Sequence, residues 1–213
     1  MSSSLVTPAT RQRVRDLATP IATALGRLGL TPNALTLIGF AGTCVAAYAA
    51  ANQAWLVAGV LVLVFGIFDL FDGALARATG QASKLGAFLD STFDRAGEAI
   101  VYIGIAWGSI QAAYPQDAIL AASALGASFL VSYTRAKSES LGFTAGTGMA
   151  AIGLAPREVR LVILAIGLML APQVIGGMSG PVGMGGALGL ITILATITVI
   201  QRILHVRAQA REG

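Results

Sequence analysis

The chain is divided into six apolar runs that are separated by short polar turns. A helix needs about 20 apolar residues to cross the hydrocarbon core of a bilayer. The runs are Ala34–Ala51, Trp55–Phe68, Ala99–Ile110, Ala118–Tyr133, Leu161–Met178 and Val182–Ile200. The second and third runs reach the required length only if their helices continue into the acidic stretches Asp69–Arg77 and Gly86–Glu98. This pattern predicts an all-α integral membrane protein with six transmembrane helices.

Charged side chains are too scarce for a soluble protein. Only 11% of the 213 residues are charged, 14 Lys or Arg and 10 Asp or Glu, whereas a soluble domain has about 25%. This shortage excludes a disordered protein and a soluble enzyme, including a prenyl-diphosphate enzyme with Asp-rich motifs. It also excludes a nucleic-acid partner, because a nucleic-acid binder carries its basic stripe on a polar surface.

The basic residues are sorted to one side of the predicted bundle. With six spans, one side receives the two termini and the segments 77–86 and 134–160, and all 14 basic residues, Arg95 included, fall on that side. The opposite turns, near Asn52, Gln111–Asp117 and Ser179, contain none. The positive-inside rule therefore predicts a multi-pass protein of the cell membrane with both termini in the cytoplasm.

A separate amphipathic helix is expected before the first span. Its apolar residues recur at steps of three and four, and they are Val14, Leu17, Ile21, Leu25 and Leu28. Such a stripe, flanked by arginines, is typical of a helix in the membrane interface. An alternative is packing on the cytoplasmic ends of the spans. We expect a cytoplasmic N-terminus over 1–30, a six-helix domain over 31–206 and a cytoplasmic tail over 207–213.

Four aspartates lie where the second and third runs meet their polar extensions. Asp69 and Asp72 are spaced i, i+3, and Asp90 and Asp94 are spaced i, i+4, so each pair shares a helix face. The short loop between the two helices predicts antiparallel neighbours with converging acidic faces. Unpaired carboxylates repel in a low dielectric, and divalent cations would relieve that repulsion. An alternative is a set of ion pairs with the nearby cations Arg77, Lys84 and Arg95.

These acids belong to a longer pattern with eight fixed positions over 26 residues, Asp69-x2-Asp72-Gly73-x2-Ala76-Arg77-x8-Gly86-x3-Asp90-x3-Asp94. The pattern resembles the signature of the CDP-alcohol phosphotransferase (CDP-alcohol phosphatidyltransferase) family of six-span membrane enzymes. The resemblance implies a transferase of phospholipid biosynthesis in which an acceptor hydroxyl attacks the β-phosphorus of a CDP-linked lipid and CMP leaves. It also implies a homodimer.

The resemblance assigns roles to individual residues. Asp69, Asp72 and Asp90 would bind a first Mg²⁺ or Mn²⁺ ion, Asp90 and Asp94 would bind a second, and Asp94 would be the general base. The implied contacts to the CDP-lipid are Pro32, Asn33, Asp69, Asp72, Gly73, Ala76, Arg77 and Ser83. From position alone, the alternatives are a helix start at Thr31-Pro32-Asn33 and a solvated loop at Ser83.

Three arginines are candidates for binding an acceptor phosphate. Arg135, Arg157 and Arg202 lie at the ends of the fourth, fifth and sixth spans, where they would face the same cavity as the aspartates. The positive-inside bias alone is the alternative explanation.

The acceptor itself is suggested by local similarity. The stretch Gly86–Arg95 resembles the branch of the family that joins CDP-diacylglycerol to inositol 1-phosphate, giving phosphatidylinositol phosphate. Pro156-Arg157-Glu158-Val159-Arg160 keeps the arginine spacing of that branch but not its flanking acid. Glycerol 3-phosphate, or the substrates of archaetidylinositol-phosphate and di-inositol-phosphate synthesis, are therefore alternatives.

A second class of function is an ion-coupled membrane transporter, because intramembrane carboxylates also mark ion paths. Transporters usually bind their substrates near the bilayer midplane and often contain inverted repeats. In this chain the acids cluster at one edge, and the two halves share no repeat. Glu98 extends the face of Asp90 and Asp94 by one further step, and we expect it to order water or Arg95 without a catalytic role.

Overall fold

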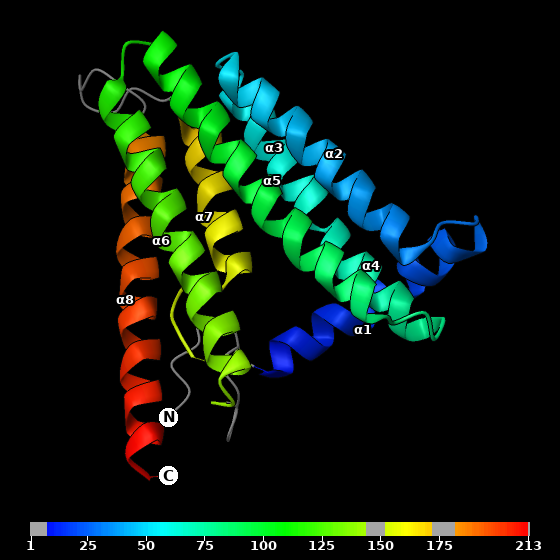
Figure 1. The fold of residues 1–213 in the computed structure, drawn as a ribbon. Helices are drawn as coiled ribbons and strands as arrows, with labels where there is room; N and C mark the ends of the chain where they lie inside the picture. The colour runs from blue at the N-terminus through cyan, green and yellow to red at the C-terminus, as the bar shows by residue number, and fades with distance from the viewer. Residues whose placement is uncertain (1–7, 144–151, 172–181, 213) are drawn as a thin grey trace.

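The computed structural model describes residues 8–143, 152–171 and 182–212, and every regular element within these ranges is an α-helix (Figure 1). The helices are α1 (Pro8–Arg27), α2 (Pro32–Ala51), α3 (Trp55–Gly66), α4 (Phe68–Ala78), α5 (Lys84–Gln111), α6 (Pro115–Ser140), α7 (Arg157–Leu170) and α8 (Val182–Glu212). The predicted all-α class is confirmed.

Several helices have the length and apolarity of membrane spans. Among the described residues there are four, Pro32–Ala51, Trp55–Ala78, Pro115–Ser140 and Gly183–Arg211. The protein is therefore a multi-pass membrane protein. α5 is long enough at 28 residues, but its first half contains two of the four aspartates. The predicted fifth span, Leu161–Met178, extends beyond the described part of α7, and a count of six spans stays a prediction.

Six of the helices pack side by side in a closed ring (Figure 1). The order around the ring is α2, α5, α6, α8, α7 and α3, and α3 packs again on α2. The core between them is rich in alanine, with Ala46, Ala50, Ala58, Ala121 and Ala124 fully buried. Small side chains allow close approach of helix backbones, which stabilises helix contacts in lipid.

Glycines at two helix pairs show how close this packing is. A Cβ atom built on Gly104 or Gly108 of α5 would collide with the backbone carbonyls of Ala47 or Ala50 on α2. A Cβ atom on Gly59 of α3 would lie 2.7 Å from the Ala165 carbonyl oxygen of α7. The α2–α5 and α3–α7 contacts therefore depend on the absence of side chains at these positions.

The second predicted span is interrupted. α3 ends at Gly66 and α4 begins at Phe68, with Ile67 forming a turn in which the Leu70 N–H donates to the Ile67 carbonyl at 3.0 Å. The extension of this run into Asp69–Arg77 is confirmed, but as a separate helix. The extension of the third run is also confirmed, since α5 begins at Lys84.

α1 packs on α4, as the alternative for the amphipathic helix anticipated. Ala18 and Ala22 are buried there with Leu75, whereas Leu17 and Ile21 are 72% and 51% exposed. One part of the apolar surface of α1 is therefore in contact with α4, and another part is exposed. The location of this helix in the membrane interface stays a prediction. At the other end of the chain, α8 continues as a helix through the residues assigned to a tail.

Candidate active site

The acidic residues are carried by two helices that meet across a cavity. Asp69 and Asp72 lie in the first turns of α4, and Asp90 and Asp94 lie in the second and third turns of α5. We expected these helices to be direct neighbours, and this was wrong in detail. α4 packs on α1 and α2, and α5 packs on α2 and α6. Their acidic faces converge because both helices pack on α2.

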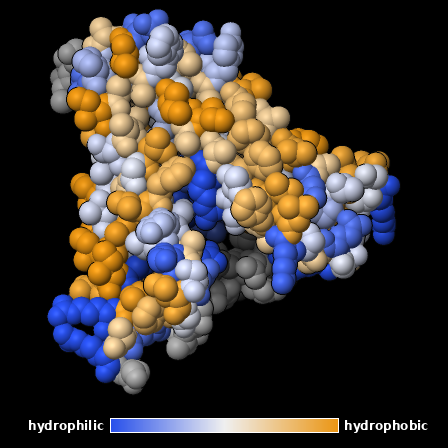
Figure 2. Space-filling model, viewed as in Figure 1, coloured by the Kyte–Doolittle hydropathy of each residue, from blue (hydrophilic) through white to orange (hydrophobic). Residues whose placement is uncertain are grey.

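The cavity has a volume of about 1080 Å³ and is lined by residues of α3, α4, α5, α6, α7 and α8. Figure 2 shows hydrophilic residues in a hollow of the surface, with apolar residues on both sides of it. Asp69, Asp90 and Asp94 line one side of the cavity from α4 and α5. The basic residues of the other side come from α6, α7 and α8, and they are Arg135, Arg157, Arg160 and Arg202. Arg95 on the first side and Glu139 and Glu158 on the second also line the cavity. Aspartates thus predominate on one side, called the acidic wall below, and arginines predominate on the other, called the basic wall.

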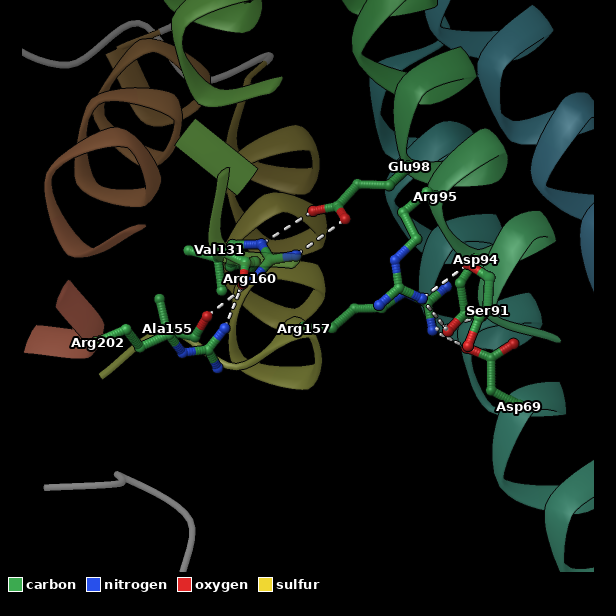
Figure 3. Close-up of polar contacts among 10 residues, drawn as sticks. All are labelled: Asp69, Ser91, Asp94, Arg95, Glu98, Val131, Ala155, Arg157, Arg160 and Arg202. Carbon is green, nitrogen blue, oxygen red and sulfur yellow. Dashed lines mark hydrogen bonds and ion pairs between the residues drawn. The ribbon is translucent and has the colours of Figure 1, made fainter. Parts of the chain in front are cut away.

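Arg157 joins the two walls (Figure 3). Its NH1 group donates a hydrogen bond to Asp69 Oδ2 and lies 3.1 Å from Asp94 Oδ1. Asp90 lies close enough to Asp69 for the two carboxylates to repel, and the charge of Arg157 partly offsets that repulsion. The Arg157 Nε atom is buried and has no hydrogen-bond partner among the described residues. One guanidinium thus neutralises carboxylates from two helices.

Asp72 does not line this cavity, although its carboxylate lies close enough to those of Asp69 and Asp90 for the charges to repel. Asp72 is 4% exposed, and its Oδ2 atom accepts a hydrogen bond of 2.6 Å from Thr36 Oγ1 on α2. A bond of this length to a charged acceptor is among the stronger hydrogen bonds in proteins. Sequence reasoning missed Thr36, although it lies one helical turn after Pro32 and Asn33.

The carboxylates do not form a ready-made metal cage. Within the described residues, no three His, Cys, Asp or Glu side chains converge closely enough to hold an ion. A physical reason is visible in the Arg157 guanidinium, which occupies the space between Asp69 and Asp94 that a shared cation would take. The four carboxylates are nevertheless suitable ligands for Mg²⁺ or Mn²⁺, because both ions prefer carboxylate oxygens. The Arg157 guanidinium between Asp69 and Asp94 also shows that this place accommodates positive charge.

Apart from Asp69, which lines the cavity, the residues implied for the CDP-lipid lie outside it. Besides Asp72, they form two groups. In the first, Ser83 Oγ caps α5 by accepting from the Gly86 N–H at 3.0 Å, and Asn33 Oδ1 lies beside Gly86. Pro32 is in the first turn of α2, where Thr31 caps the helix. These positions are helix starts, as the alternatives for Thr31-Pro32-Asn33 anticipated.

The second group lies on α4. The Arg77 guanidinium folds back along its own helix, so that a Cβ atom on Gly73 would lie 3.3 Å from Arg77 NH1. Gly73 and Ala76 are partly exposed beside it. Small residues under an arginine leave room for a flat group to approach the backbone, which is the property that the resemblance requires.

The three arginines predicted to clamp a phosphate all line the cavity, but each already has protein partners. Arg135 pairs with Glu139 at 2.9 Å, and Arg157 pairs with the aspartates. Arg202 is 5% exposed and donates to the backbone carbonyls of Val131 and Ile152. The positive charges of Arg135 and Arg202 lie close enough to repel, so an anion between them would be stabilised.

A second ion pair lies deeper in the ring. Glu98 of α5 and Arg160 of α7 are joined by hydrogen bonds of 3.0 and 2.9 Å. We expected Glu98 to order water or Arg95, and this was wrong. Arg95 instead donates to the Ser91 carbonyl at 2.7 Å and lies 3.7 Å from Asp94 (Figure 3). The helix face of Glu98 was evident from its spacing, but its partner 62 residues away was not.

Comparison with known proteins connects this geometry to a family. Residues 29–201 match the family model of CDP-alcohol phosphatidyltransferases. The archaetidylinositol phosphate synthase of Pyrococcus horikoshii is 37% identical over 203 residues, covering 95% of this chain and 97% of that protein. The phosphatidylinositol phosphate synthase of Cutibacterium acnes is 36% identical over 196 residues, covering 88% of this chain and 91% of that protein.

Solved structures agree. The phosphatidylinositol phosphate synthase of Mycobacterium tuberculosis with CDP-DAG bound has a TM-score of 0.76 and 29% identity to this chain, covering 90% of it and 94% of that chain. The same enzyme in complex with manganese and citrate has a TM-score of 0.74, covering 89% and 88%. The family match covers the aspartate pattern and most of the helical ring, so this protein belongs to the CDP-alcohol phosphatidyltransferase family and is a transferase.

Proposed function

We propose that this enzyme transfers the phosphatidyl group of CDP-diacylglycerol to a hydroxyl of inositol 1-phosphate, giving phosphatidylinositol phosphate and CMP. The observation that carries the proposal is that the acidic wall and the basic wall face one and the same cavity. The acidic wall is suited to the cations that accompany a diphosphate, and the basic wall is suited to the phosphate of an anionic acceptor. The names of the relatives from Cutibacterium acnes and Mycobacterium tuberculosis support this acceptor.

The metal ligands would be Asp69, Asp72, Asp90 and Asp94, holding two ions of Mg²⁺ or Mn²⁺. When bound, such ions neutralise negative charge that develops on a phosphoryl group during transfer. The manganese complex of the Mycobacterium tuberculosis relative supports a divalent metal. The position of the Arg157 guanidinium between Asp69 and Asp94 also supports a cation at this place.

The CDP-lipid would lie between the starts of α2 and α5 and the exposed side of α4. Asn33 and Ser83 are close together at these starts and offer polar contacts to the nucleoside. Arg77 would turn from its own helix to the diphosphate, and Gly73 and Ala76 would let the base and ribose approach the backbone. Pro32, Asp69 and Asp72 complete the proposed contacts.

In the transfer itself, Asp94 would take the proton of the attacking hydroxyl. A bond forms between the acceptor oxygen and the β-phosphorus, and the bond between that phosphorus and the CMP oxygen breaks. Arg135, Arg157 and Arg202 would hold the acceptor phosphate so that its hydroxyl points at the acidic wall. Catalysis then consists of positioning and charge stabilisation, as in other phosphoryl transfers.

The proposal extends to the arrangement in the membrane. We infer six spans in a domain over 31–206, with the 1–30 helix in the interface and the 207–213 segment, both termini and the active site in the cytoplasm. The one-sided placement of all 14 basic residues supports this topology. A homodimer in the cell membrane is proposed by resemblance.

The decisive experiment measures CMP release by the purified protein in liposomes that contain CDP-diacylglycerol and Mg²⁺ or Mn²⁺. Inositol 1-phosphate, glycerol 3-phosphate and free inositol are compared as acceptors. CMP release that depends on inositol 1-phosphate would support the proposal, whereas release with glycerol 3-phosphate alone would replace the acceptor. No release with any acceptor would favour a transporter.

The lipid donor has a second candidate. The similarity to the archaetidylinositol phosphate synthase of Pyrococcus horikoshii favours an archaetidyl group in place of the diacyl group. The same assay with CDP-archaeol separates the two, because a preference for that donor would show in kcat/KM at a fixed acceptor concentration.

A further inference from the structure

α2 packs on both helices that carry the four aspartates, and its contact with α5 changes in character along its length. The two helices lie side by side (Figure 1). In the half farther from the aspartates, a Cβ atom on Gly104 of α5 would lie 2.3 Å from the Ala47 carbonyl oxygen of α2. A Cβ atom on Gly108, one turn on, would meet the Ala50 carbonyl oxygen at 2.2 Å. The backbones of α2 and α5 are therefore in direct contact in this half.

Larger side chains fill the space between α2 and α5 near the aspartates. A Cβ atom on Gly97 would lie 3.1 Å from the Thr43 methyl group. One turn closer to the acidic end, the rings of Phe40 and Phe93 are in contact, with centroids 4.9 Å apart and planes tilted by 45°. This spacing is normal for an aromatic pair. Because two rings need more room than a backbone contact, the helix axes are held farther apart at the acidic end.

The contact of α2 with α4 is of the opposite kind. A Cβ atom on Gly39 of α2 would lie only 3.0 Å from the Cβ atom of Phe68 on α4. Gly39 and Phe40 are adjacent in the chain, and successive residues of a helix point about 100° apart, so the two residues face different neighbours. α2 therefore holds α4 close to its backbone and holds α5 at the distance of two rings.

The two phenylalanines that meet α2 stand next to proposed metal ligands. Phe68 comes directly before Asp69, and Phe93 comes directly before Asp94. Consecutive residues of a helix differ in height by about 1.5 Å, so both contacts with α2 lie at the level of the aspartates. A change in the size of either contact therefore moves an aspartate relative to α2.

Packing alone does not explain a ring pair at this place. The other half of the same contact shows that α2 and α5 can approach through glycine and alanine, which is the arrangement that favours helix association in lipid. The Phe40–Phe93 pair gives up that close approach. What the pair provides is a wider separation of α2 and α5 next to Asp94.

We propose that Phe40 and Phe93 are positioning residues for the metal site. Their rings form a spacer that keeps α5 away from α2 while α4 stays close to it, so α2 sets the gap between the two acidic helix faces. The proposal rests on the proposed function, because it treats the four aspartates as ligands of Mg²⁺ or Mn²⁺. It assigns neither ring a contact with a metal ion or a substrate.

The binding test measures the Mn²⁺ affinity of the full-length protein from the electron-spin signal of the free ion. Phe93→Leu keeps an apolar side chain but removes the ring, and it should weaken Mn²⁺ binding about tenfold, the lower end of the effect of losing a residue that orients a metal ligand. Phe93→Tyr, which keeps the ring, should retain the parental affinity. Phe129→Leu on α6, a helix that carries none of the four aspartates, is the matched control.

A double variant tests whether the two rings act as one spacer. Residues in contact have effects that do not add, so adding Phe40→Leu to Phe93→Leu should change the Mn²⁺ affinity little further. Two independent, multiplicative losses would overturn the proposal. Parental affinity in Phe93→Leu, or an equal loss in the control Phe129→Leu, would overturn it as well.

A distance measurement decides the structural part without any metal. Nitroxide labels are placed at exposed positions of α2 and α5 for pulsed electron-spin spectroscopy, with Cys44→Ser removing the native thiol. The pair near the aspartates is Leu37→Cys with Leu85→Cys, and the pair at the other end is Tyr48→Cys with Trp107→Cys. Phe93→Leu should shift the distance near the aspartates and leave the other unchanged, because the glycine contacts still hold that half.

Two distance results would refute the spacer. One is an unchanged distance near the aspartates in Phe93→Leu, and the other is an equal change at both ends, which would show a general loss of structure. A failure of the proposed function has a different signature. The parent enzyme would then bind no Mn²⁺ and release no CMP, whereas the label distances would still report whether the rings separate α2 from α5.

Discussion

Removing the hydroxyl of Thr36 isolates one contact of the proposed metal site. Thr36 is 8% exposed on α2, and its Oγ1 donates to Asp72 Oδ2 at 2.6 Å. The substitution Thr36→Val keeps the branched shape and replaces the donor with a methyl group. Asp72 would remain buried in the same place without its hydrogen bond.

The magnitude follows from the type of bond. A hydrogen bond to a charged group contributes about 1.5–3 kcal/mol, and each 1.36 kcal/mol is a factor of ten. An equilibrium that needs Asp72 ionised and correctly oriented should therefore shift about 10- to 150-fold. Loss of a residue that orients a metal ligand typically lowers metal affinity by about 10- to 100-fold, which agrees with this range.

The assay is a titration with Mn²⁺, followed by the electron-spin signal of the free ion. Thr36→Val is expected to weaken Mn²⁺ binding at least about tenfold, and Thr36→Ser should restore most of the affinity. Thr43→Val is the matched control, because Thr43 Oγ1 donates to the Gly39 carbonyl within the same helix at 2.9 Å. Parental Mn²⁺ affinity in Thr36→Val would refute the argument that Thr36 orients a metal ligand.

Three further predictions concern catalysis, charge and packing. Asp94→Asn should keep much of the CDP-lipid binding in a calorimetric titration but lose CMP release, and full turnover would contradict the base assignment. Arg157→Gln should lower the Tm of chelator-treated protein more than that of Mn²⁺-loaded protein, because the carboxylates lose their internal cation, and equal shifts would count against that role. Gly104→Ala should destabilise the protein by about 1–3 kcal/mol, because the new methyl group overpacks the contact with α2. Gly126→Ala, where nothing lies within 4 Å, is its control, and equal Tm values for the two variants would be inconsistent with the close α2–α5 contact.

Much of the fold could be predicted because it depends on local properties. The apolar runs determine where helices form, and the polar extensions of the second and third runs proved to be helical. The interruption at Ile67 was not predictable, since the residues on either side continue a helical pattern. The split stripe of α1 was not predictable either, because an apolar face is equally suited to a membrane surface and to α4.

For the site, the residue types could be predicted and their partners could not. Helical spacing placed Asp90, Asp94 and Glu98 on one face of α5. It did not indicate that Arg157 faces Asp94 while Arg160 faces Glu98, because those contacts depend on the rotation of one helix relative to another.

By itself, the sequence determined the class of protein, the sidedness suggested by its basic residues and the pattern of eight positions that marks the family. These are properties of composition and short spacing, and they do not require knowledge of helix packing. The tertiary structure decided which charges meet. Thr36 reaches Asp72 across 36 residues, Glu98 reaches Arg160 across 62, and Asp69 reaches Arg157 across 88. The physical reason is that helix periodicity defines a face, whereas only packing around the ring defines what that face opposes.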